Sequence, residues 1–263
     1  MDFFQVIILG IIQGLTEFLP VSSSGHLVLV SIVMGWKDQG LVMDVAAHAG
    51  SLMAVMFYFR VELKQMLQVA VNPRNQADKE TLRLAIAIVV GTIPIVIAGL
   101  LFANQIEKYL RTTEIIAITT IIFALLLAYA DKKGKQIHDE YQMSWSDVVF
   151  IGVAQAFALI PGTSRSGVTM TAGLMLGMNK VAAARFSFLL SIPTILAAIA
   201  YKSLKLLSVE VDADFVAIMG VFIISAVVAY FCINIFIRIV KVVGMMPFVI
   251  YRIILGVALL AFI

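Results

Sequence analysis

Residues 17–26, EFLPVSSSGH, form a polar stretch between two apolar runs. The stretch holds a carboxylate, three adjacent hydroxyl groups and an imidazole. Pro20 cannot continue a helix from within, and the residue before a proline avoids the helical conformation, so we expect a helix to break near Leu19. Ser22 to Ser24 can then cap a second helix that starts around Gly25. The pattern predicts two short helices with polar side chains gathered at the break between them.

The composition predicts a polytopic helical membrane protein. Of the 263 residues, 62% are hydrophobic and 13% are charged, with a mean hydropathy of +1.03, whereas soluble domains carry roughly 25% charged residues. The net charge of +3 comes largely from basic residues in short loops between apolar runs, so it indicates membrane orientation and not nucleic-acid binding. The first residues, MDFF, lack a basic segment, and we expect no cleaved signal peptide.

The apolar runs are arranged in two similar halves. Each half has a short, broken apolar unit followed by three longer runs, and the second break is PGTSRSG, residues 161–167. A broken helix is tolerated at membrane depth only where its backbone is buried or lines a polar cavity. We therefore expect an all-α fold with one membrane domain, residues 1–263, in which each half is a re-entrant helical hairpin plus three transmembrane helices. The expected repeats are about 1–130 and 145–263, with hairpins over 3–35 and 145–177, spans over 43–59, 84–103, 113–130, 181–201, 214–237 and 247–263, and a polar loop over 60–83.

The repeats are expected to have inverted topology. A shift of 142 positions places Gln13 on Gln155, Ser22 on Ser164, Ser24 on Ser166 and Gly25 on Gly167. Three spans per half reverse the orientation of the second copy, and on that assignment the loops on one side hold twelve basic residues against five on the other. The richer side is cytoplasmic by the positive-inside rule. The two breaks then meet inside the bilayer, where interrupted helices form binding sites.

The residues at the breaks are typical of phosphoryl-transfer chemistry. Gln13 and Glu17 are four residues apart and project from one helix face. Helix N-termini bind phosphate, and Arg165 offers a planar fork for bidentate contact. Serine hydroxyls can donate hydrogen bonds or act as nucleophiles, and His26 can carry protons near neutral pH. The same layout would serve a secondary transporter or a flippase for a lipid phosphate or small anion, and this alternative stays open. His48 is expected to line the pocket or to play a structural role.

The two breaks resemble the paired signatures of a known family. QGLTEFLPVSSSGH (residues 13–26) and PGTSRSG (residues 161–167) are similar to the motifs of the bacterial undecaprenyl-diphosphate phosphatases of the bacitracin-resistance type, and the length and segment layout agree over the whole chain. The resemblance implies an enzyme of the bacterial cytoplasmic membrane that converts undecaprenyl diphosphate to the monophosphate carrier of peptidoglycan synthesis. It also implies a cavity open to the outer face and a divalent cation, Mg²⁺ or Ca²⁺.

Carried over residue by residue, the resemblance implies roles for four residues. Glu17 is the essential carboxylate and metal ligand, Ser23 the favoured nucleophile, His26 an acid/base partner and Arg165 the phosphate clamp. His26 and water activated by the cation are rival nucleophiles. The residues expected to bind the phosphates lie at or beside the breaks: Gln13, Ser22, Ser24, Gly25, His48, Thr163, Ser164, Ser166 and Gly167.

One position departs from many members of the family. Position 13 is often a carboxylate there, and the neutral amide of Gln13 brings no negative charge to a cation, so Gln13 is only a possible further metal ligand. The expected partners are undecaprenyl diphosphate and membrane lipid, with no nucleic acid. A homodimer is compatible with the sequence, because small residues such as Gly91 and Gly99 can pack helices within one chain or between chains.

Overall fold

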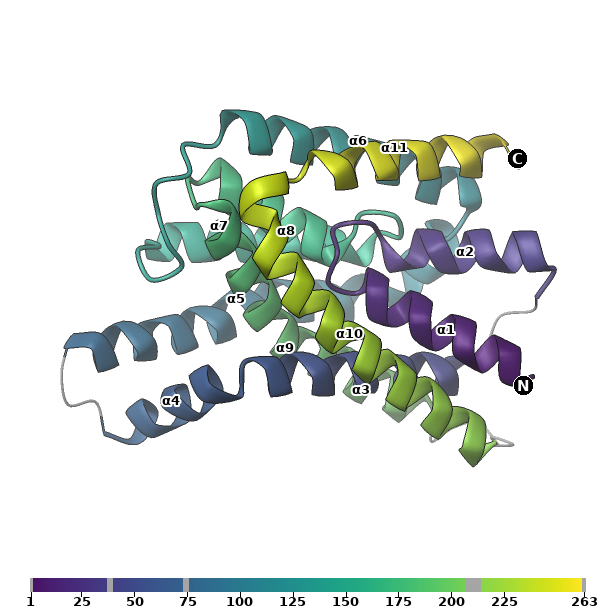
Figure 1. Ribbon diagram of the computed structural model, residues 1–263, viewed down its shortest axis with the longest axis horizontal. Coiled ribbons are helices and arrows are strands. Elements are labelled where there is room, and N and C mark those ends of the chain that lie inside the picture. Colours follow the sequence, from purple (N-terminus) through teal and green to yellow (C-terminus); the bar gives the residue numbers. More distant parts are fainter. Residues whose placement is uncertain (1, 37–39, 73–75, 207–213, 262–263) are drawn as a thin grey trace.

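The computed structural model describes residues 2–36, 40–72, 76–206 and 214–261, and within these ranges every regular element is a helix (Figure 1). Lys37 and Arg74, which entered the charge count, lie outside the described residues. The helices are α1 Phe3–Thr16, α2 Ser23–Met34, α3 Leu41–Tyr58, α4 Arg60–Val71, α5 Gln76–Tyr109, α6 Thr113–Lys133, α7 Trp145–Ala156, the short 3₁₀ helix η1 Phe157–Leu159, α8 Arg165–Met175, α9 Lys180–Leu206, α10 Phe215–Val243 and α11 Met246–Ala261.

Five of the described helices are long and apolar enough to cross a membrane, namely α3, α5, α6, α9 and α10. Five of the six expected spans therefore coincide with such helices. The sixth, expected over 247–263, is α11, which has 16 residues and is counted with the shorter apolar helices α1 and α7–η1. The prediction of an all-helical, multi-pass membrane protein agrees with these helices.

The expected polar loop over residues 60–83 is wrong. Residues 60–71 form α4, and α5 already begins at Gln76 and runs for 34 residues to Tyr109. Leu63, Met66 and Val69 recur at three-residue spacing, and Met66 and Val69 are buried. The charged residues of the first turns, Arg60, Glu62 and Lys64, hide this helical period when the segment is judged by its composition.

Both predicted helix breaks are present. The first separates α1, which ends at Thr16, from α2, which begins at Ser23, two residues before the expected start. The second follows η1 and ends where α8 begins at Arg165. Each break thus brings its polar residues to the start of a new helix.

The core is centred on α9, because 61% of the residues in its most apolar 18-residue segment are buried. Phe18 beside the first break stacks edge-on against Phe188 of α9, with ring centroids 5.3 Å apart, and Phe188 contacts Phe236 of α10. Helix α10 crosses α3 and packs along α1, while α6 and α11 run side by side (Figure 1). Gly91 packs within the chain, because a Cβ atom on Gly152 of α7 would lie 2.8 Å from the Gly91 carbonyl oxygen.

Candidate functional site

The first break is closed by an unusual turn at Ser22. Its φ of 72° lies in the left-handed region, a conformation that costs a non-glycine residue on the order of 1–3 kcal/mol. The Ser22 hydroxyl accepts a hydrogen bond from the Gly25 amide at 3.4 Å, and its carbonyl accepts one from the His26 amide at 3.4 Å. Ser22 is therefore the residue that caps α2, as the serine run predicted.

The second break is closed in the same way. Ser164 has a φ of 68°, and its hydroxyl accepts a hydrogen bond from the Gly167 amide at 3.2 Å. Its carbonyl accepts one from the Val168 amide at 2.9 Å. The residues that the 142-position shift aligned, Ser22 and Ser164, thus have the same backbone strain and the same capping role.

An ion pair joins the two breaks. Arg165 Nη2 donates to Glu17 Oε1 at 2.8 Å and to the Glu17 carbonyl oxygen at 3.3 Å. Only 11% of the Arg165 side chain and 8% of the Glu17 side chain are exposed. Arg165 Nη1 also donates to the Ser187 carbonyl oxygen at 3.3 Å, which fixes the guanidinium against α9. The carboxylate and guanidinium singled out from the sequence are in direct contact.

Glu17 has two further neighbours from the predicted set. The Gln13 amide nitrogen donates to Glu17 Oε2 at 3.0 Å, as their four-residue spacing indicated. His48 of α3 places Nε2 3.9 Å from the same oxygen, while its Nδ1 bonds to the Asp44 carbonyl oxygen at 2.7 Å. The structure thus brings Gln13, Glu17, His48 and Arg165 together. We call this group the ionic centre.

A serine contact also links the breaks. The Ser166 hydroxyl donates to the Leu19 carbonyl oxygen at 2.8 Å, and it lies 3.3 Å from the Ser164 hydroxyl. Thr163 is fully buried, and its Oγ1 is without a hydrogen-bond partner among the described residues. These contacts place the second motif against the first.

The predicted nucleophile and its partner lie in the first turns of α2. Ser23 is partly buried. His26 bonds through Nδ1 to the Ser22 carbonyl oxygen at 2.7 Å and through Nε2 to the Tyr251 hydroxyl at 2.6 Å. Both ring nitrogens are thus engaged by groups other than Ser23, and the pairing of Ser23 with His26 stays a prediction. Ser24 lies in the same turn, and its side chain is outside what the structure describes.

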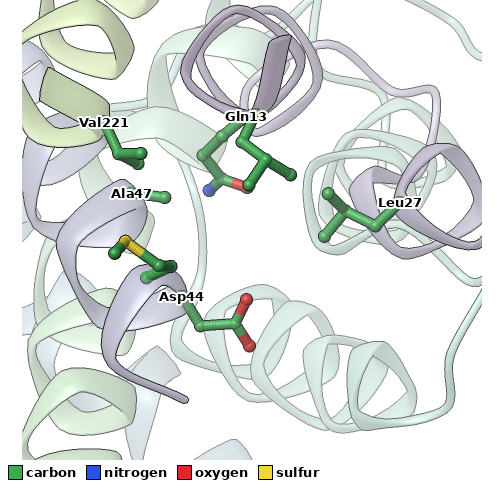
Figure 2. A pocket seen from close by; sticks show the side chains of 7 residues that line it. Gln13, Leu27, Asp44, Ala47 and Val221 are labelled. Carbon is green, nitrogen blue, oxygen red and sulfur yellow. The ribbon is translucent and has the colours of Figure 1, made fainter. Parts of the chain in front are cut away.

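A small pocket, open at one side, lies beside the ionic centre. Gln13 of α1 and Asp44 of α3 face it, and Leu27, Ala47 and Val221 supply apolar walls (Figure 2). Asp44 also pairs with Lys202 of α9 at 3.1 Å. Because Gln13 bonds to Glu17, this largely apolar pocket adjoins the charged groups.

Comparisons with known proteins identify the family of the chain. A family model described as "Bacitracin resistance protein BacA" matches residues 6–258. The chain is 51% identical over 263 residues to undecaprenyl-diphosphatase 1 of Pseudoalteromonas translucida, covering 100% of this chain and 99% of that protein. It is 53% identical to undecaprenyl-diphosphatase 2 of Stutzerimonas stutzeri over 99% of this chain and 98% of that protein. The chain belongs to the BacA family.

One residue of this BacA-family chain was missed by sequence reasoning. Arg252 of α11 is fully buried, and its Nη2 donates to the carbonyl oxygens of Gly162 at 3.1 Å and Thr163 at 2.9 Å. Its Nε and Nη1 are without partners among the described residues. The available signal was the same as for Arg165, since a charged residue inside an apolar run is a functional candidate.

The side chains of this BacA-family chain do not form a metal cage by themselves. Among the described residues no group of three histidine, cysteine, aspartate or glutamate side chains could hold an ion. Glu17 Oε1 is paired with Arg165 and Oε2 with Gln13. Mg²⁺, however, is usually bound through one or two carboxylates together with substrate phosphates and waters. The donor set therefore fits a cation that shares its ligands with a phosphate, with Glu17 as the available carboxylate.

Proposed function

We propose that this chain hydrolyses undecaprenyl diphosphate to undecaprenyl phosphate and inorganic phosphate, the activity that the names of its relatives give for them. The observation that carries the proposal is the contact between Arg165 and Glu17, residues 148 positions apart, at 2.8 Å. It joins a carboxylate of the first break and the guanidinium of the second in one buried contact. The product is the lipid carrier of peptidoglycan synthesis, and its recycling accounts for bacitracin resistance.

We also propose that the chain is an inverted-topology repeat of two re-entrant hairpins, each with three transmembrane helices. Ser22 and Ser164 support this with their shared left-handed φ and capping bonds. The packing partners support it too, because exchanging the halves converts one contact into another. The α1–α10 contact corresponds to α7–α5, α2–α11 to α8–α6, and α3–α10 to α9–α5.

Substrate binding starts from a neutralised arginine. In the resting arrangement Glu17 occupies Arg165 Nη2, so an entering phosphate competes with the carboxylate for the guanidinium. Arg252, at the second break, adds a buried positive charge, and its Nε and Nη1 nitrogens donate to no described residue. The first turns of α2 and α8 add the positive ends of two helix dipoles. Arg252 Nη1 lies close to Gly167 in the first turn of α8, and this supports a position for the terminal phosphate at the start of that helix.

In the favoured mechanism Ser23 is the nucleophile. Its Oγ forms a bond to the terminal phosphorus as the bridging P–O bond breaks, and the electron pair of that bond leaves with undecaprenyl phosphate. The Ser23 proton passes to a base, for which His26 and Glu17 are the candidates. Water then attacks the phosphoserine, which releases inorganic phosphate and restores the hydroxyl. His26 as the nucleophile and direct attack by water are the rival schemes.

A divalent cation, Mg²⁺ or Ca²⁺, fits this scheme as a companion of the diphosphate. Glu17 would hold it directly or through water, with Gln13 Oε1 as a possible further donor. When bound, the cation neutralises charge on the phosphate oxygens. Glu17 would then have two alternative partners, Arg165 before the substrate binds and the cation afterwards.

The proposed setting is the bacterial cytoplasmic membrane, with the cavity open to the outer face. The apolar pocket walls at Leu27, Ala47 and Val221 support a substrate whose lipid chain leaves sideways toward the bilayer (Figure 2). The homodimer stays a prediction.

Phosphate release from undecaprenyl diphosphate by the purified protein in detergent tests the proposed function. No compartments exist in detergent, so release of inorganic phosphate is expected from a hydrolase and not from a flippase or transporter. Arg165→Lys is the companion variant, which keeps the charge and loses the planar fork. Binding of the lipid without any phosphate release would overturn the hydrolase and favour the transport alternative.

A further inference from the structure

Two neighbouring residues of α11 hold the two breaks. Arg252 binds the carbonyl oxygens of Gly162 and Thr163 in the second break. Tyr251, one residue earlier, bonds through its hydroxyl to His26 Nε2 at 2.6 Å, on the helix that follows the first break. Helix α11 belongs to neither motif, and it is nevertheless positioned to set the geometry of both.

The contacts of His26 determine which nitrogen carries its proton. The Ser22 carbonyl oxygen, 2.7 Å from Nδ1, can only accept a hydrogen bond, so Nδ1 is the donor. In the neutral ring Nε2 then has the lone pair, and the Tyr251 hydroxyl donates to it. Nε2 is the atom through which His26 would accept a proton. Its single lone pair is engaged by the Tyr251 hydroxyl, so a proton reaches Nε2 either through that hydroxyl, which gives its own proton to Nε2 as it takes one up, or after the hydroxyl turns away.

Tyr251 also fixes the plane of the imidazole. The two rings are stacked, with centroids 5.4 Å apart and planes inclined by 10°. Tyr251 itself is 45% exposed, so its hydroxyl is not needed to fill the protein core. The stacking and the hydrogen bond together restrict His26 to one orientation and one tautomer.

We infer that Tyr251 is a positioning residue of the phosphatase, which acts through His26 by keeping Nε2 in place as a hydrogen-bond acceptor. This inference rests on the proposed function, because it assigns His26 a part in hydrolysis. Tyr251 has no bond to the phosphate in this role. Its contribution depends on His26 being present, which makes it separable from a role in folding or in substrate binding.

The test is a double-mutant cycle with Tyr251→Phe and His26→Gln, assayed by phosphate release in detergent. Tyr251→Phe keeps the stacked ring and removes the hydroxyl. We expect kcat to fall about tenfold, the equivalent of one hydrogen bond, while KM changes less than about twofold. In the His26→Gln background the same change should cost less than about twofold. Tyr129→Phe, at a 59% exposed tyrosine of α6, is the matched control and should behave as wild type.

A spectroscopic measurement reports on the contact directly. The chain has three histidines, so the ¹⁵N resonances of His26 can be assigned by comparison with His26→Gln. Tyr251→Phe should move the Nε2 resonance and leave Nδ1, which Ser22 still holds, nearly unchanged. Wild-type phosphate release with an unaltered kcat in Tyr251→Phe would overturn the positioning role alone, as would an equal loss with and without His26. Absence of phosphate release by the wild type would overturn the proposed function instead.

Discussion

The ion pair between Arg165 and Glu17 predicts a large cost when one partner is removed. Both side chains are about nine-tenths buried. When Arg165 is replaced by methionine, Glu17 keeps the hydrogen bond from the Gln13 amide but loses its cationic partner. An uncompensated buried charge of this kind costs about 3–5 kcal/mol. At roughly 2–4 °C per kcal/mol for a chain of this size, Arg165→Met should unfold about 6–20 °C earlier than wild type.

The double variant Arg165→Met, Glu17→Met distinguishes this reasoning from general damage to the core. It leaves no unpaired carboxylate, so it should be more stable than Arg165→Met alone, although two residues are changed. Thermal unfolding in detergent measures the effect for both single variants and the pair. A double variant whose loss equals the sum of the single losses would show that the two side chains do not form a buried pair.

The variant Arg165→Lys should lower the activity while leaving the thermal stability nearly unchanged. Lysine keeps the positive charge beside Glu17, so the thermal midpoint should stay close to that of wild type. It cannot reproduce the paired N–H donors that Arg165 directs at Glu17 and the Ser187 carbonyl. Losing about 2 kcal/mol of such contacts in the transition state corresponds to roughly a 30-fold fall in kcat/KM. Near-normal kcat/KM in this variant would refute the clamp role.

Three further predictions follow from the geometry of the breaks. A Cβ atom on Gly167 would lie 2.7 Å from Arg252 Nη1, whereas one on Gly25 would lie 3.4 Å from its nearest atom. Gly167→Ala should therefore lower the free energy of unfolding by about 1–3 kcal/mol and remove most of the activity. Gly25→Ala should have much smaller effects, and thermal unfolding and phosphate release measure both variants. Gln13→Glu places a second carboxylate beside Glu17 and should lower the Mg²⁺ concentration for half-maximal activity, and an unchanged Mg²⁺ titration would contradict this. Chelation of divalent cations should stop phosphate release, and calorimetry should detect Mg²⁺ binding only when a diphosphate is present.

The contact between the two breaks could be predicted from the sequence because polar groups within apolar segments need polar partners. Pro20 marks the first interruption, and Arg165 between two serines marks the second. A carboxylate or a guanidinium without a partner is costly in an apolar interior, so contact between Glu17 and Arg165 is favourable. The left-handed turns at Ser22 and Ser164 were not predictable, since serine rarely adopts them and only the surrounding packing enforces them.

The features that the sequence did not predict lie in segments without a distinctive motif. Helix α4 was mistaken for a loop because its charges mask the spacing of Met66 and Val69. Tyr251 and Arg252 belong to an apolar run without a motif, and their roles depend on how α11 packs against α2 and α6. Contacts between helices far apart in the chain determine such roles, and no local pattern encodes them.

The charges around the breaks explain why a neutral amide suits position 13. Arg165 and Arg252 bring two positive charges to the second break, and Glu17 is the carboxylate paired with one of them. A carboxylate at position 13 would lie within hydrogen-bond distance of Glu17, as the Gln13 amide does at 3.0 Å, and would repel it. The amide instead donates a hydrogen bond to Glu17, whose other carboxylate oxygen is paired with Arg165. The described partners of Arg252 are neutral carbonyl oxygens, and this supports the proposal that an anionic phosphate balances its charge.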